Sequence, residues 1–175
     1  MIASYARWQP EDHGTPRADV LIRPVRPHDV PALARVMAAR GGAPETHTDA
    51  AALLLDRAPV LLLAVAEDGG GDALGWSGAL QTSVHPGEHP VWLTAGLTVV
   101  PQARRAGVGL RLLHAVAEAV RTSRIETGPL HSVVNTRNRA SLALHARAGF
   151  QETASGPRFA GIEFDGGDGV LLRRR

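Results

Sequence analysis

The stretch from Val99 to Gly109 constrains the fold of this chain more than any other. Its sequence is VVPQARRAGVG. The two valines end a predicted apolar strand, a basic loop follows, and the two glycines lie in the first turn of a predicted amphipathic helix. Glycines at such a place let backbone N–H groups approach a ligand closely, and a helix N-terminus attracts anions. Arg104 and Arg105 add charges that pair with phosphate oxygens. The arrangement favours a pyrophosphate as its ligand.

Other readings of this stretch meet specific objections. A glycine pair is also typical of a tight turn with no ligand. A dinucleotide-binding fingerprint fails, because Leu112 stands where the third glycine belongs and arginines already fill the loop. The sequence contains no lysine, which excludes a Walker phosphate loop, a Schiff base and a pyridoxal phosphate site.

Composition excludes several further classes of site. The chain has no cysteine, so disulfides, thiolate metal sites and a cysteine nucleophile are excluded. His85 and His89 lie four residues apart in a Pro/Gly turn that is not helical, and no third ligand accompanies them, so no metal is expected. The net charge is only +2 and aromatic residues are 4% of the chain, which argues against a nucleic-acid partner.

The length of 175 residues predicts one domain, at residues 20–175, after a flexible N-terminal segment at residues 1–19. No apolar run approaches the roughly 20 residues that span a bilayer, so no membrane partner is expected. The N-terminal segment has no apolar signal region, and the default location is the cytoplasm. The oligomeric state, including a homodimer, stays open.

Hydrophobic patterning and breakers predict an alternation of strands and helices. The strands are expected at Val20–Val25, Val60–Ala66, Ala73–Ser83, Val91–Val100, Leu130–Val134, Gln151–Ser155 and Gly169–Arg173. The helices are expected from Asp29 to about Arg40, from Thr46 to about Arg57, from Gly107 to about Ser123 and over Arg139–Ala148. The last two strands are expected to be joined by an irregular stretch, Gly156–Asp168.

Local signals at the helix ends support these boundaries. Asp29 is a candidate N-cap of the first helix, and Thr46 with Asp49 resembles a capping box that opens the second. Asn138 is a candidate cap of the last helix, and Gly149 fits the left-handed position after its end.

Two motifs resemble those of the GCN5-related N-acetyltransferase (GNAT) family. Arg104-x-x-Gly107-x-Gly109 resembles its acyl-CoA signature, and the run from Asn138 through Ser141, Leu144 and His145 to Gly149-Phe150 is similar to its closing helix and turn. The resemblance implies an α/β fold, in which a mixed, mostly antiparallel central sheet is flanked by helices. It also implies acetyl-CoA as co-substrate and an amine as acceptor.

The resemblance also assigns the residues that bind the coenzyme. One strand splays from its neighbour so that pantetheine hydrogen-bonds into the gap, and a strand N–H near Val99 faces the thioester oxygen as an oxyanion hole. The N–H groups from Arg105 to Leu110 are expected to bind the pyrophosphate. The implied coenzyme-binding residues are Leu97, Thr98, Val99, Arg104, Arg105, Ala106, Gly107, Val108, Gly109, Leu110, Asn138 and Ser141.

His145 is where the chain departs from the family pattern, which commonly has a tyrosine that protonates the departing thiolate. Histidine can take the same role as a proton donor, and even its neutral ring keeps one N–H. The alternative is that His145 only packs against Phe150. Asn138 similarly serves either as a helix cap alone or also as a ligand of pantetheine.

The sequence does not single out a general base. Asp49, Glu88 and Glu163 lie in segments that border a predicted acceptor pocket, but each is better explained as a solvated surface charge or a cap than as a catalyst.

The function predicted from these features is acetyl transfer from acetyl-CoA to a primary amine of a small molecule or peptide, by direct attack in a ternary complex. The alternatives are a non-catalytic acyl-CoA-binding or sensing module and a nucleotide-binding protein.

Overall fold

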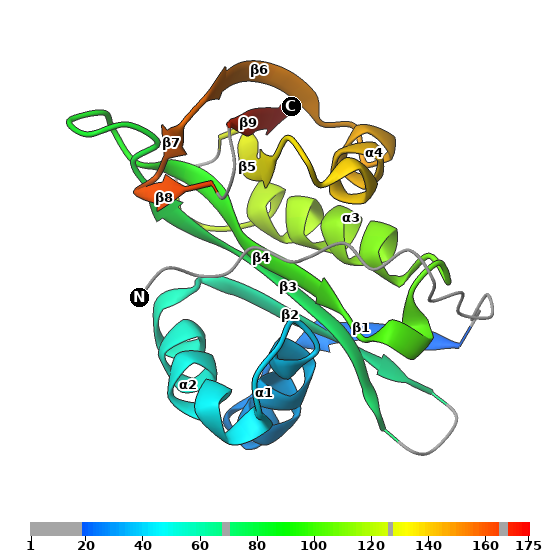
Figure 1. Cartoon of the computed structure of the whole chain (residues 1–175). Helices are drawn as coiled ribbons and strands as arrows, with labels where there is room; N and C mark the ends of the chain where they lie inside the picture. Colours follow the sequence, from blue (N-terminus) through cyan, green and yellow to red (C-terminus); the bar gives the residue numbers. More distant parts are fainter. Residues whose placement is uncertain (1–18, 68–70, 126–127, 165–167) are drawn as a thin grey trace.

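A seven-stranded mixed sheet forms the centre of the molecule, with strand order β1-β2-β3-β4-β5-β9-β6 (Figure 1). All neighbours are antiparallel except β4 and β5, so the predicted mostly antiparallel sheet is confirmed. The strands are β1 Val20–Pro24, β2 Val60–Ala66, β3 Ala73–Thr82, β4 Val91–Val99, β5 Leu130–Asn135, β6 Gln151–Gly156 and β9 Gly169–Arg174.

This computed structural model describes residues 19–67, 71–125, 128–164 and 168–175. The N-terminal segment predicted to be flexible lies outside the described residues, apart from Asp19.

In the described part of the chain, four α-helices cover the two faces of the sheet. Helices α1 and α2 lie on one face, whereas α3 and α4 lie on the other (Figure 1). The α-helices are α1 Val30–Ala38, α2 Thr48–Arg57, α3 Val108–Arg121 and α4 Arg139–Arg147, and three short 3₁₀ turns are η1 Pro27–Asp29, η2 Pro44–His47 and η3 Pro101–Ala103. The order of elements agrees with the sequence prediction.

Helix α3 packs on the sheet through the predicted apolar stripe. Val108, Leu112, Val116 and Val120 recur at every fourth position, and each is at most 2% exposed. Residues four apart share one face of a helix, which explains why this whole stripe is buried. The stripe fixes α3 against β2, β3 and β4 and thereby holds its N-terminus beside the end of β4.

Helix α4 has the two ends that its sequence predicts. The Asn138 side chain accepts a hydrogen bond from the Ser141 N–H at 3.0 Å, so it caps the helix. Gly149 has φ +85°, and the Phe150 N–H donates to the His145 carbonyl at 3.0 Å. This left-handed ending turns the chain sharply into β6.

The predicted caps of the first two helices are wrong in detail. Asp29 occupies the N-cap position, but its carboxylate is held instead by the Arg23 guanidinium, at 2.6 and 2.7 Å. A bidentate charged pair outcompetes a single cap hydrogen bond. The Thr46 hydroxyl donates to the Ala43 carbonyl within η2, and α2 begins only at Thr48, so Thr46 and Asp49 form no capping box.

The stretch predicted to be irregular between β6 and β9 contains a small antiparallel hairpin, β7 Arg158–Phe159 with β8 Ile162–Glu163. Phe159 packs with Val84 and Phe164 in a satellite apolar cluster. Only two residues form each strand, so the alternation that signals a strand was too short to recognise.

Candidate active site

Strand β4 separates from β5 soon after the two strands begin. They pair only at Trp92–Leu130 and Leu93–His131, although β4 continues to Val99 and β5 to Asn135. The sheet therefore opens into a V whose vertex lies just after Leu93 on β4 and just after His131 on β5. The splayed strand that the family resemblance implies is present.

The opposite edge of β4 stays paired with β3 but contains a bulge. Gly78 pairs with Gly96 and the next pair is Ala79 with Thr94, so Ala95 is the extra residue of β4. The Trp76 ring covers Gly96, where an added Cβ would lie 2.8 Å from the ring. The bulge bends β4 close to the point where it leaves β5.

The backbone groups of β4 beyond the bulge point alternately to its two sides. The Val100 N–H donates to the Leu74 carbonyl on the β3 side. Successive peptide groups of a strand point in opposite directions, so the N–H groups of Leu97 and Val99 point to the open side of the V. These are the strand groups that the resemblance assigns to pantetheine and the oxyanion.

Two arginines reach the carbonyl groups at this open edge. Arg40, just after α1, donates from its guanidinium to the Leu97 carbonyl. Arg104 donates from Nε to the Val99 carbonyl at 3.3 Å. The mouth of the V therefore carries positive charge beside an open strand edge, which suits an anionic ligand that pairs with backbone.

The loop between β4 and α3 has an unusual backbone. Arg105 has φ +63°, a left-handed conformation that is costly for a residue with a side chain, and Gly107 follows at φ +81°. Gly107 is the N-cap of α3, and nothing lies within 4 Å of a Cβ placed on it. The loop thus leaves an open approach to the N-terminal N–H groups of α3, where anions bind favourably.

Gly109 has a different reason to be glycine. A Cβ there would lie 3.1 Å from Leu144 of α4 and within 4 Å of the Val99 and Leu97 side chains. The absent side chain lets α3 approach α4 and β4 closely at the mouth of the V. Leu97 and Val99 consequently have their side chains on the α3 face of the sheet.

Thr98 therefore points to the other face, toward α1 and α2, because alternate residues of a strand face opposite sides. Its Oγ1 and the Nε1 of Trp76, its register partner on β3, are both buried and have no hydrogen-bond partner. Thr98 is predicted to contact the coenzyme, but its side chain faces away from α3 and α4. Only its backbone lies in the open strand.

His145 lies in the interior between α4 and β5, only 3% exposed. Its Nδ1 is 2.8 Å from the Ser141 carbonyl oxygen, and its Nε2 is 2.9 Å from the Ser132 hydroxyl. The ring meets that of Phe150 edge-on, with centroids 5.1 Å apart. Burial lowers the pKa of His145 below its usual value, partly offset by the hydrogen bond to Ser141. The imidazole is therefore neutral at neutral pH.

The structure brings the two predicted motifs together. The loop and first turn of α3 adjoin α4 through the Gly109–Leu144 contact, and Asn138 and Ser141 lie in the first turn of α4. Arg105 is exposed, while Ala106 and Val108 are buried and offer only their backbone. Leu110 is half-buried within the first turn of α3.

The three carboxylates considered as general bases do not gather at the V. Asp49 is exposed on α2, Glu88 is exposed in the turn between β3 and β4, and Glu163 pairs with Arg158 in the β7–β8 hairpin. Among the described residues, Asp29 is the one buried carboxylate. The Arg23 hydrogen bonds hold the pKa of Asp29 at about 2, despite the opposing effect of its burial. Asp29 therefore forms an ion pair with Arg23 and is not a candidate general base.

Within the described ranges, no group of three or more His, Asp or Glu side chains is arranged to hold a metal ion. None of the described helices is long and apolar enough to cross a membrane.

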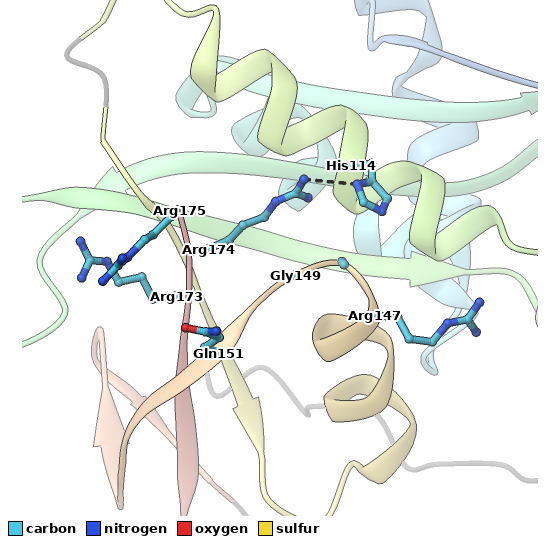
Figure 2. Close-up of a pocket in the computed structure, with 8 residues that line it drawn as sticks. His114, Arg147, Gly149, Gln151, Arg173, Arg174 and Arg175 are labelled. Carbon is cyan, nitrogen blue, oxygen red and sulfur yellow. Dashed lines mark hydrogen bonds between the residues drawn. The ribbon is translucent and has the colours of Figure 1, made fainter.

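A hollow of about 400 Å³ lies at the C-terminal end of α4, away from its Asn138 cap (Figure 2). Arg174 donates from Nη2 to His114 Nδ1 at 3.3 Å, and its Nη1 is buried without a partner. Figure 2 shows Arg147 pointing away from the C-terminal arginines, so the charges do not converge on one point. The lining residues are His114, Arg147, Ala148, Gly149, Gln151, Arg173, Arg174 and Arg175.

Comparison of the sequence with models of known protein families identifies the family of this chain. The family model described as an acetyltransferase (GNAT) domain matches residues 19–151, which is more than half of the chain. The protein belongs to the GNAT family. A search of curated proteins finds no match.

Solved structures share the fold at low sequence identity. Ribosomal-protein-S5-alanine acetyltransferase from Vibrio fischeri aligns with a TM-score of 0.68 and 13% identity, covering 93% of this chain and 96% of that chain. Arabidopsis thaliana NAA60, in complex with acetyl-CoA, aligns with a TM-score of 0.66 and 17% identity, covering 88% of this chain and 97% of that chain. A phosphinothricin acetyltransferase from Sinorhizobium meliloti, also in complex with acetyl-CoA, aligns with a TM-score of 0.63 and 16% identity. The alignment covers 89% of this chain and 88% of that chain.

Sequence reasoning missed two residues at the V. Ser132 alternates with Leu130 and Val134 on the buried face of β5, and a polar residue at that position of the alternation was the signal available for it. Arg40 is 57 positions from Leu97 in the chain, and nothing local connects them. Long-range contacts of this kind are set by the packing of α1 on the sheet.

Proposed function

We propose that this protein is an N-acetyltransferase that transfers the acetyl group of acetyl-CoA to a primary amine by direct attack in a ternary complex. The observation that carries the proposal is the V between β4 and β5, which opens beside the N-terminus of α3. Membership of the GNAT family and the acetyl-CoA complexes among its structural neighbours support the same co-substrate.

The coenzyme would bind along the open edge of β4. The N–H groups from Arg105 to Leu110, at the start of α3, receive the pyrophosphate, with the exposed Arg105 side chain pairing with phosphate oxygens. The N–H groups of Leu97 and Val99 pair with the pantetheine arm, and the one near Val99 stabilises the oxyanion that forms when the amine attacks the thioester carbonyl. Asn138 and Ser141 approach the same arm from α4.

The acceptor would arrive on the face covered by α1 and α2. On that face Thr98 Oγ1 and Trp76 Nε1 lack partners within the protein, and buried polar groups of this kind are satisfied by a ligand or by water. Opposite, His145 lies near the vertex and would assist departure of the thiolate. The two co-substrates thus approach β4 from opposite faces of the sheet.

Thiol release from acetyl-CoA, followed with a disulfide dye, tests the proposal. A protein without cysteine contributes no thiol to this assay. Pools of small amines, amino acids and peptides serve as acceptors. Release that depends on one pool is the expected result. Tight acetyl-CoA binding without release from any pool would favour the non-catalytic binding module instead, and absence of binding would overturn both readings.

A further inference from the structure

Ser132 occupies the vertex of the V. The last paired residues are Leu93 on β4 and His131 on β5, and Ser132 is the next residue of β5. It is 4% exposed and is one of five polar or charged residues buried in the described part of the chain. A hydroxyl is expensive to bury unless it is hydrogen-bonded.

The contacts of His145 fix the direction of its hydrogen bond with Ser132. The Ser141 carbonyl oxygen, 2.8 Å from Nδ1, can only accept, so Nδ1 carries the ring proton. In the neutral ring Nε2 then has the lone pair, and the Ser132 hydroxyl donates to it at 2.9 Å. A hydroxyl, an imidazole base and a group that orients the base thus lie in series, which is the arrangement that activates hydroxyls in enzymes.

We propose that Ser132 and His145 form a proton relay that first accepts the proton of the attacking amine and then delivers it to the departing thiolate. The proposal rests on the proposed acetyl transfer and supplies the general base that the sequence does not identify. Its geometric support is the position of Ser132 at the vertex and the hydrogen bond of its hydroxyl to His145 Nε2.

The steps balance within the relay. The neutral amine attacks the thioester carbonyl and becomes an ammonium group in the tetrahedral intermediate. That group gives a proton to Ser132 Oγ while the hydroxyl proton moves to His145 Nε2, forming an imidazolium. When the C–S bond breaks, the sulfur takes the electron pair, Ser132 gives it a proton, and the imidazolium returns its proton to Ser132. The products are an amide and a thiol, and the relay ends as it began.

The environment of His145 fits a group that acts first as a base. The ring is buried against Phe150, Ser132 and Ser141, and burial lowers its pKa, so the lone pair is available at neutral pH. The one buried carboxylate among the described residues, Asp29, is committed to Arg23 before α1 begins. The described core therefore offers no carboxylate to replace the relay.

Kinetics of Ser132→Ala test the relay, with Ser155→Ala as a control that makes the same change on β6, two strands away from β5. Loss of general acid–base assistance predicts a fall in kcat of about 100-fold or more, while KM for acetyl-CoA changes less than about threefold. Ser132→Thr, which keeps the hydroxyl, should restore most of the rate. A Ser132→Ala variant that binds acetyl-CoA and retains the wild-type kcat overturns the relay and leaves the acetyltransferase assignment standing.

A double-mutant cycle with His145→Gln tests whether the two residues act as one unit. The double variant should be no slower than the slower single variant, since either change already breaks the relay. Losses that multiply would show independent roles and overturn the proposal.

¹⁵N NMR of the His145 ring gives a readout that needs no acceptor. The relay requires a neutral ring protonated at Nδ1 with its lone pair at Nε2, and the Nε2 signal should shift in Ser132→Ala. A neutral ring protonated at Nε2 would overturn the relay even if the wild-type enzyme transfers acetyl groups. If the wild-type protein releases no thiol with any acceptor, the proposed acetyl transfer is wrong, and the relay, which depends on it, is wrong as well.

Discussion

The two edges of β4 differ in how their backbone is used. Along one edge, eight residues of β3 pair with β4, from Gly75–Val99 to Thr82–Val91. Along the other, β5 pairs at two positions and then departs. Unpaired strand edges are a liability that proteins usually cover. An edge left open inside a sheet, with arginines at its Leu97 and Val99 carbonyls, is therefore the part of β4 to which the proposed function assigns the coenzyme.

The comparison also separates two kinds of glycine. On the closed side, Gly96 is required by packing, because the Trp76 ring lies where its Cβ would be. On the open side, Gly107 is surrounded by free space and is required only by its backbone angle. Packing glycines should govern stability, whereas the glycine at the start of α3 should govern binding.

The largest expected effect is therefore at Gly96. Gly96→Ala places a Cβ 2.8 Å from Trp76 at φ +149°, and we expect a loss of about 3 kcal/mol in the free energy of unfolding. Urea denaturation measures it. Gly41→Ala is the matched control, because Gly41 also has a positive φ but nothing within 4 Å of an added Cβ. Equal losses in the two variants would show that the Trp76 contact contributes nothing.

The next largest effect concerns the free energy of unfolding at acidic pH, which depends on the ion pair between Arg23 on β1 and Asp29. Arg23 on β1 holds the pKa of Asp29 at about 2, against 3.8 for a free aspartate. The native state thus binds fewer protons, and stability of about 2 kcal/mol is present above pH ~4 and lost as the pH falls toward ~2.

Denaturation of wild type and Asp29→Asn as a function of pH checks this. Asp29→Asn should be less stable at neutral pH and should lose less stability than wild type on acidification from pH ~5 to ~3. Parallel curves for the two proteins would mean that the ion pair adds no stability.

On the open side, Gly107→Val should weaken binding while the fold survives. Valine at φ +81° costs about 1–2 kcal/mol of stability, and its side chain would occupy the open space at the N-cap of α3, where the proposed function places the pyrophosphate. Isothermal titration with acetyl-CoA should show affinity reduced tenfold or more. Gly87→Val carries the same backbone penalty, at φ +83°, away from this loop and should bind normally. Unchanged affinity in a folded Gly107→Val would refute the assignment.

The smallest effect separates the two roles of Asn138. Asn138→Ala removes the cap of α4 and should cost about 1 kcal/mol of stability. Asn138→Ser keeps a capping oxygen on a shorter side chain and should recover that stability. If Asn138 also contacts pantetheine, both variants bind acetyl-CoA more weakly than wild type. Normal affinity in Asn138→Ser would leave the cap as its whole role.

Local signals in the sequence were enough to predict most elements and the loop that leads from β4 into α3. The stripe through Val108 and Leu112, the cap at Asn138 and the glycine at position 149 act over a few residues, so their structures follow from nearby sequence. The caps at Asp29 and Thr46 failed because partners elsewhere, or a competing 3₁₀ turn, took the side chain.

The vertex could not be predicted in the same way. The Ser132–His145 hydrogen bond joins a strand to a helix, and its donor direction depends on the Ser141 carbonyl. The V opens where β5 stops pairing with β4, and no local pattern in the sequence predicts that position. Sequence therefore located the two motifs that resemble those of the family, whereas tertiary packing determines which side chains meet at the vertex of the V.

Amide hydrogen exchange with and without acetyl-CoA tests the central claim most directly, because it reads the two edges of β4 separately. We expect the coenzyme to slow exchange at the N–H groups of Leu97 and Val99 and through the loop from Arg105 to Leu110. The N–H groups that pair with β3, such as that of Val100, should change little. Unchanged exchange along the open edge, with acetyl-CoA bound, would place the coenzyme elsewhere and contradict the account.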